Sequence, residues 1–163
     1  MKQVKLFLLL YVISLSLSSC VSLKRPTATF YSPIQGYKYI YIAPTTEKHS
    51  VEGGLYGGPN GIYGITTSSS INPSDLISGH FLKKGYIRVQ EITPENADKT
   101  IIVNYGEDNN GELVLSKRIG VIIQMISADK NEIICICTGE AEGLTDAEAI
   151  TKAINLAMNE FFR

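Results

Sequence analysis

Histidine and cysteine, the residues from which metal sites and nucleophiles are most often built, are scarce in this sequence. Its 163 residues include two histidines, His49 and His80, and three cysteines. The histidines have no spacing typical of a zinc site. No Ser/His/Asp arrangement and no motif of paired carboxylates can be recognised. We therefore predict no catalytic residue, no metal ligand and no cofactor.

Charge of one sign is also lacking. The chain has 15 Lys and Arg against 16 Asp and Glu, a formal net charge of -1, without a cluster of either sign. A nucleic-acid-binding surface needs a concentration of basic residues, so this class of partner is not expected. Glycines are frequent in 52–64, but a phosphate-binding loop also needs a Lys-Ser/Thr pair, which is missing there.

Long hydrophobic runs are absent as well. The longest, 6–17, follows Lys2 and Lys5 and has about twelve residues, whereas a membrane-spanning helix needs roughly 20. A short basic start followed by such a run is typical of a signal peptide, predicted here for residues 1–19.

The end of this segment reads Leu17-Ser18-Ser19-Cys20. It resembles the lipobox of bacterial lipoproteins, in which an aliphatic and two small residues precede a cysteine. The resemblance implies that Cys20 becomes the N-terminus and carries a diacylglyceryl group, with an acyl chain such as palmitate on its amine. Membrane lipid is then a partner through acylated Cys20, since acyl chains contribute about 0.8 kcal/mol per buried methylene. Loss of Lys2 and Lys5 would leave 13 basic against 16 acidic residues in the mature chain.

The residues after Cys20 bear on its location. In these lipoproteins an aspartate after the cysteine retains the protein at the inner membrane, and here Val21 follows. The resemblance thus implies the outer membrane. The acidic cluster that directs some lipoproteins to the cell surface is missing, which favours a domain facing the periplasm. Residues 20–35 lack any helical or strand period and are predicted to be a tether of about 50 Å reach when extended.

Cys135 and Cys137 remain as candidates for a disulfide. They lie two apart in a run that reads as a strand, so their Cα atoms would be about 6.6 Å apart, close to the limit for bridging. We expect two thiols. The isoleucines around them would raise the pKa of both and disfavour a role as nucleophile.

The predicted domain, 36–163, begins with a strand over 36–44. Ile40 and Ile42 should face the core, which leaves Tyr37, Tyr39 and Tyr41 as a row on the other side. This row could contact a sugar, peptide or protein partner. The strand preference of tyrosine alone explains the pattern, and we favour that interpretation.

Residues 52–64 contain six glycines interleaved with Tyr56 and Tyr63. Gly58-Pro59-Asn60-Gly61 is a strong turn signal, so a short hairpin or flap is predicted. Ordering so many glycines is costly, and the tyrosines could recover that cost at a partner's surface. The alternative is a loop that only joins two elements.

The rest of the chain predicts a helix capped by Asn72, a strand over 86–92, three antiparallel strands over 101–107, 112–127 and 132–141, and a C-terminal helix opened by a capping box of Thr145 and Glu148. This order predicts an α+β fold, a two-layer sandwich with a mostly antiparallel sheet of four to five strands and two helices on one face. It resembles small α/β modules related to the N-terminal domain of TolB and to curli-secretion-type lipoproteins.

The two central strands are apolar on both faces, as Val121, Ile123 and Met125 alternate with Ile122 and Ile126. Either the flap or another protein chain must cover the second face. We therefore expect an anchored envelope protein that acts as a non-enzymatic interaction or assembly module, contacting another envelope protein or a second copy of itself. The alternatives are a small-ligand or metal-binding protein, or a hydrolase whose site the sequence does not reveal.

Overall fold

The computed structural model describes residues 22–45, 48–58, 61–113 and 116–163, with side chains for all of these except 48–69 and 109–113. The described elements are, in chain order, β1 Thr27–Phe30, β2 Tyr39–Ile42, β3 Lys48–Gly58, β4 Gly61–Ile71, α2 Pro73–Lys83, β5 Ile87–Arg88, the 3-10 turn η1 Ala97–Lys99, β6 Thr100–Leu113, β7 Ser116–Ser127, β8 Ile133–Gly143 and α3 Asp146–Phe161.

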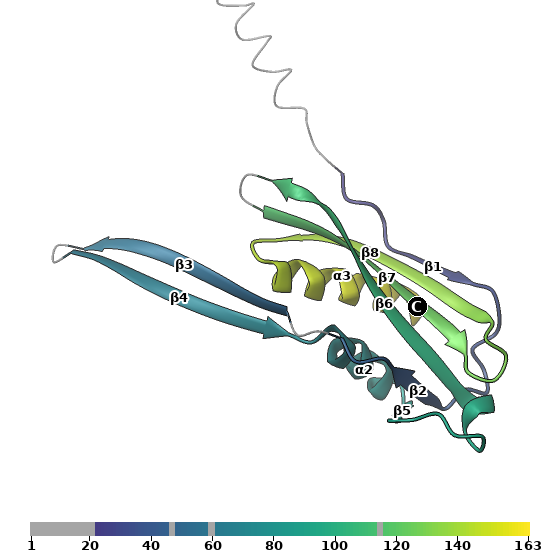
Figure 1. Cartoon of the computed structure of the whole chain (residues 1–163). Coiled ribbons are helices and arrows are strands. Elements are labelled where there is room, and N and C mark those ends of the chain that lie inside the picture. Colours follow the sequence, from purple (N-terminus) through teal and green to yellow (C-terminus); the bar gives the residue numbers. More distant parts are fainter. Residues whose placement is uncertain (1–21, 46–47, 59–60, 114–115) are drawn as a thin grey trace, which may run out of the picture.

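Six of the strands form one sheet in the order β1-β8-β7-β6-β2-β5 (Figure 1). The meander β6-β7-β8 is antiparallel, as predicted, and β1 pairs antiparallel with β8. Strand β2 pairs parallel with both β5 and β6. The α+β prediction is confirmed, but the sheet has six strands rather than four to five and is mixed. The strand predicted over 86–92 is only the two residues of β5.

The two helices begin as their sequences predict. The Asn72 side chain accepts a hydrogen bond from the backbone N–H of Ser74 at 3.0 Å, with Pro73 in the first turn of α2. Thr145 Oγ1 accepts from the N–H of Glu148 at 3.2 Å at the start of α3. The Glu148 carboxylate in turn accepts from the N–H of Leu144 at 2.8 Å, one residue before the cap, rather than from Thr145 itself. Among the residues described, no helix is long and apolar enough to cross a membrane.

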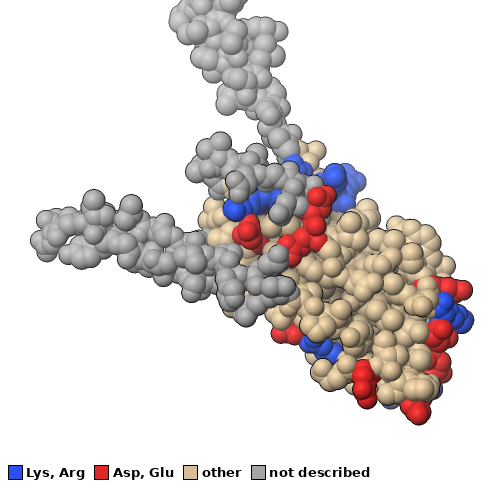
Figure 2. All heavy atoms as spheres, viewed as in Figure 1, with Lys and Arg blue, Asp and Glu red and all other residues tan. Residues whose placement is uncertain are grey.

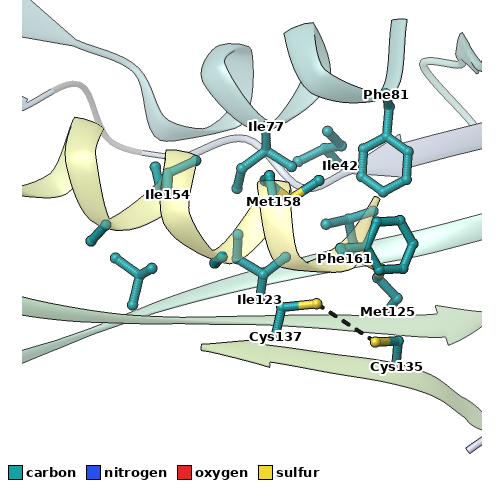
Figure 3. Close-up of a cluster of buried hydrophobic side chains, with 14 of the residues drawn as sticks. Ile42, Ile77, Phe81, Ile123, Met125, Cys135, Cys137, Ile154, Met158 and Phe161 are labelled. Atoms are coloured by element: carbon teal, nitrogen blue, oxygen red, sulfur yellow. Dashed lines mark hydrogen bonds between the residues drawn. The ribbon is translucent and has the colours of Figure 1, made fainter. Parts of the chain in front are cut away.

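The core lies between one face of the sheet and the two helices. Figure 3 shows Ile77 and Phe81 of α2 pointing toward α3, and Ile154, Met158 and Phe161 of α3 in the same cluster as side chains of the strands. The sheet meets them with alternate residues of its strands, all at most 4% exposed: Ile40, Ile42, Ile101, Val103, Ile123, Met125, Cys135 and Cys137. The inward-facing alternate residues of the strands and the apolar stripe of α3 thus form one apolar layer.

The segment predicted to be a tether is not free. Thr27 to Phe30 form β1 at the edge of the sheet, and the Thr27 and Thr138 hydroxyls are hydrogen-bonded at 2.7 Å. Phe30 stacks on Phe161 of α3 with ring centroids 5.5 Å apart. The prediction of a tether over 20–35 is therefore wrong for its described part, because a short, weakly patterned strand gains its stability from the neighbour with which it pairs.

The glycine-rich segment forms a longer hairpin than predicted. Strands β3 and β4 have eleven residues each and pair as a separate two-stranded sheet, with Tyr56 opposite Tyr63 in register. The hairpin projects away from the body of the domain and touches α3 (Figure 1). It does not cover the second face of the six-stranded sheet. The prediction that the flap could cover this face is therefore wrong.

Candidate functional site

The second face of the sheet, which we call the outer face, is the side opposite the helices. It is defined by Tyr39, Tyr41, Ile102, Asn104, Ile122, Gln124, Ile126, Ile136 and Thr138, and none of these is buried. Ile122 lies near its centre and is 49% exposed. The side of the molecule seen in Figure 2 is largely free of charged side chains, which gather toward its ends. No described helix covers this face, which leaves an aliphatic centre with amide and hydroxyl groups around it.

One end of the outer face is covered by the first described residues of the chain. The N–H of Lys24 donates to Glu140 Oε2 at 2.7 Å. Arg118 Nε donates to Glu140 Oε1 at 2.8 Å, and Arg118 Nη2 donates to the carbonyl oxygen of Ser22 at 2.8 Å. We call Arg118 and Glu140 the clamp, because this ion pair between β7 and β8 binds the backbone of residues 22–24.

The clamp is largely removed from water, with the Arg118 and Glu140 side chains 12% and 5% exposed. Desolvation disfavours the charged form of Glu140. The hydrogen bonds from Lys24 and Arg118 and the positive charge of Arg118 outweigh it, so the pKa of Glu140 lies below its ordinary value. The carboxylate is therefore ionised at neutral pH. Sequence reasoning missed the clamp, although an arginine in β7 and glutamates in β8, both largely apolar strands, were a signal.

A small hollow lies beside the clamp. It is lined by Lys24, Arg25, Asp108, Gly120, Ile122 and Thr138, with Glu140 at its wall. Its lining brings basic side chains of the N-terminal segment against an aliphatic strand surface, and it contains no histidine or cysteine. A second hollow, with Asp98, Lys99, Asp129, Lys130 and Glu132 among its lining residues, lies at the opposite end of the sheet.

The predicted tyrosine row is brought together only in part. Tyr39 and Tyr41 lie on the outer face of β2, where Tyr41 is opposite Ile102 of β6. Tyr37 precedes the strand and packs against the hydrophobic core. The side chains of Tyr56 and Tyr63 lie outside the described residues. Tyr39 and Tyr41 thus border the outer face instead of forming a separate aromatic platform.

The histidines do not form a site in the described part of the structure. His80 Nε2 is hydrogen-bonded to Asn155 Oδ1 at 2.8 Å, across the contact between α2 and α3. His49 lies on β3, and its side chain is outside the described residues. No group of three or more His, Cys, Asp and Glu residues in the described part could hold a metal ion.

The two buried cysteines are free thiols, as predicted, with their Sγ atoms 3.6 Å apart. Figure 3 shows them on β8 beneath α3. Burial in the core raises the pKa of Cys135 and of Cys137, and for Cys137 the neighbouring thiol raises it further. Neutral thiols in an apolar layer are consistent with packing and not with a nucleophile.

Replacing Cys135 with serine is expected to destabilise the domain by about 1 to 3 kcal/mol, because a hydroxyl would be buried in an apolar layer. Cys135→Ala is the matched control: it removes the sulfur without adding a polar group, so its cost should be smaller. Urea denaturation measures both. Reductant should leave the melting temperature of the wild type unchanged, and a large drop would show that the thiols are bridged in the protein.

Comparison with known proteins adds little to these observations. No family model matches the sequence, and no curated protein matches it. A solved structure that matches is a PelC dodecamer from Paraburkholderia phytofirmans, with a TM-score of 0.49 and 10% sequence identity over 84% of this chain and 98% of that one. A similarity of this size does not assign a function to this chain.

Proposed function

We propose that this chain is a bacterial lipoprotein, anchored through acylated Cys20 in the outer membrane with its domain in the periplasm. In this proposal it acts without catalysis, as an interaction or assembly module of the cell envelope. The contact surface is the outer face, and the partner is a protein chain: another envelope protein or a second copy.

The observation that carries this proposal is the uncovered aliphatic centre of the outer face. Ile122, half exposed, lies between Gly106 of β6 and Thr138 of β8, with Asn104 and Gln124 alongside. Exposed aliphatic side chains interspersed with polar groups are typical of non-obligate protein interfaces, whose surface is only partly apolar. Because β6, β7 and β8 are held by the meander, this surface is pre-formed, so binding to it would cost little ordering entropy.

The alternative is a protein that binds a small ligand or metal, or a hydrolase with an unrecognised site. A polar pocket around His80 would favour it. His80 instead bonds Asn155 between the helices, and the two hollows described above are lined by other residues. Burial raises the pKa of both thiols, which disfavours the thiolate that a nucleophile needs, so the interaction role is the better supported one.

A photocrosslinking amino acid tests the contact surface in intact cells. Placed at position 122 on the outer face, it should give a discrete crosslinked product. Placed at position 82 on α2, it should give none. Leu82 is 52% exposed, close to the 49% of Ile122. Similar exposure makes Leu82 a matched control for reactivity. The mass of the product distinguishes a second copy from a different protein.

A substitution makes the test specific. With the crosslinker at position 124, Ile122→Asp should abolish the product, because a carboxylate in the centre of an apolar interface would be buried without a partner. Leu82→Asp should leave the product unchanged. Since both positions are exposed, neither variant should change the melting temperature by more than a few degrees. Equal products from positions 82 and 122 would contradict the assignment of the outer face.

A further inference from the structure

We infer that the end of the domain formed by Ser22 to Arg25 and Leu144, the proximal end, rests on the lipid surface, held there by the clamp of Arg118 and Glu140. This inference depends on the proposed anchorage through Cys20. It adds which part of the domain meets the membrane and which residues set that orientation.

The chain between the anchor and the clamp is short. Only Val21 lies between Cys20 and Ser22, so the Cα atoms of these two residues can be at most about 7 Å apart. The polar layer of a bilayer is roughly 5 to 8 Å deep on each side of the hydrocarbon. An acylated Cys20 would therefore place Ser22 at the level of the lipid headgroups.

Ser22 is also held to the sheet by the clamp. Its carbonyl oxygen is bonded to Arg118, and the Lys24 N–H is bonded to Glu140. Both clamp side chains are largely buried, where a charge-assisted hydrogen bond is stronger than at an exposed site. The position of the anchor is thus transmitted to β7 and β8, and through them to the whole sheet.

The proximal end exposes apolar side chains together with basic ones. Leu144, which follows β8, is 70% exposed, and Leu23 also faces solvent. Exposed aliphatic side chains beside Lys24 and Arg25 are the combination found in segments that lie in the membrane interface.

Two acidic residues at the start of α3, at this end, are engaged in ion pairs. Asp146 pairs with Lys117 and Glu148 with Lys152. At the opposite end, η1 and the turn between β7 and β8 expose Asp98, Asp129 and Glu132 beside Lys99 and Lys130, and Asp98 pairs with Lys99. The charges of the two ends therefore differ little, and the inferred orientation depends on the short chain to the anchor, the clamp and the exposed leucines.

Fluorescence quenching tests the orientation with the lipidated full-length protein in vesicles of phosphatidylethanolamine and phosphatidylglycerol. A bimane label is placed at Leu144→Cys or, as the control at the far end, at Asp98→Cys. The native Cys135 and Cys137 are buried and should not react. A nitroxide carried on lipid headgroups should quench the label at position 144 several-fold more than the label at position 98.

The clamp is tested by Glu140→Ala and Arg118→Met, read out with the label at position 144. Each should lower the quenching toward that at position 98, because the proximal end would then be free to tilt away. The matched control is Asp75→Asn on α2, which disturbs the 2.7 Å ion pair with Arg88 of β5 and should leave quenching unchanged. Circular dichroism confirms that each variant is folded, and either clamp variant suffices if the other unfolds.

The outcomes separate the two proposals. If the protein does not stay with the vesicles, the proposed anchorage fails. If it stays but the labels at positions 144 and 98 are quenched equally, the anchorage holds and the inferred orientation is wrong. Quenching at position 144 that neither clamp variant reduces would overturn the role of Arg118 and Glu140.

Discussion

Replacing Gly139 with alanine is expected to destabilise the domain by about 3 kcal/mol, at the upper end of what overpacking a core usually costs. Gly139 lies on β8 directly beneath α3. A Cβ atom there would be 2.2 Å from the carbonyl oxygen of Ala153 and 3.1 Å from the backbone nitrogen of Ala157. These are backbone atoms of a helix, so the contact can be relieved only by moving α3 off the sheet.

The sequence of α3 explains why the contact is so close. Ala149, Ala153 and Ala157 recur every four residues and are completely buried. Small side chains let the helix axis approach the strand, and Gly143 meets the same row farther along, where a Cβ would be 2.6 Å from the Ala149 nitrogen. The helix and the strand are thus complementary through residues that have little or no side chain.

Gly106→Ala is the control for this prediction. Gly106 lies on β6 of the same sheet, and nothing lies within 4 Å of where its Cβ would be. Alanine there should be neutral or slightly stabilising, because it reduces the entropy of the unfolded chain. Urea denaturation of both variants gives the two free energies of unfolding. Equal values would mean that α3 does not pack on β8 as described.

Replacing Cys20 with alanine is expected to abolish acylation and to remove the mature protein from the membrane fraction. Without the thiol there is no atom for the diacylglyceryl group to join. The protein should then be found as an uncleaved precursor or in soluble form. Metabolic labelling with palmitate, followed by fractionation and mass measurement, distinguishes these forms from the lipidated chain.

Ser19→Ala is the matched control for the anchor. It keeps a small residue before the cysteine, as the lipobox pattern requires, and should be acylated and processed like the wild type. If Cys20→Ala protein is still cleaved at the same place and remains in salt-washed membranes, the lipoprotein proposal is wrong, and so is the orientation that depends on it.

The secondary structure of the main body followed from local patterns in the sequence. Asn72-Pro73 and Thr145 with Glu148 marked the starts of the helices, and alternating aliphatic residues marked β7 and β8. These signals act over a few residues, because capping bonds and the period of the strands are set by near neighbours along the chain. The buried state of Cys135 and Cys137 followed from the same alternation.

The candidate contact surface was predicted only in outline. The apolar second face of the central strands was visible in Ile122 and Ile126, but its cover was not. A hairpin was predicted over 52–64, but neither its length and separation from the main sheet nor the position of Tyr37 away from Tyr39 and Tyr41 could be inferred. Both depend on where a segment packs, which is decided by surfaces distant in the sequence.

The sequence by itself determined the two helices, the antiparallel meander and the aliphatic character of both sheet faces, since each depends on residues close together in the chain. Only the tertiary structure decided that β2 joins the sheet parallel to β6, that 27–30 form an edge strand, and that Arg118 and Glu140 bind the backbone of residues 22–24. The hydrogen bonds of this last contact join residues that lie 96 and 116 positions apart in the sequence. Such contacts form because desolvated charges need partners once the sheet has assembled, and no local pattern along the chain records which partner they will find.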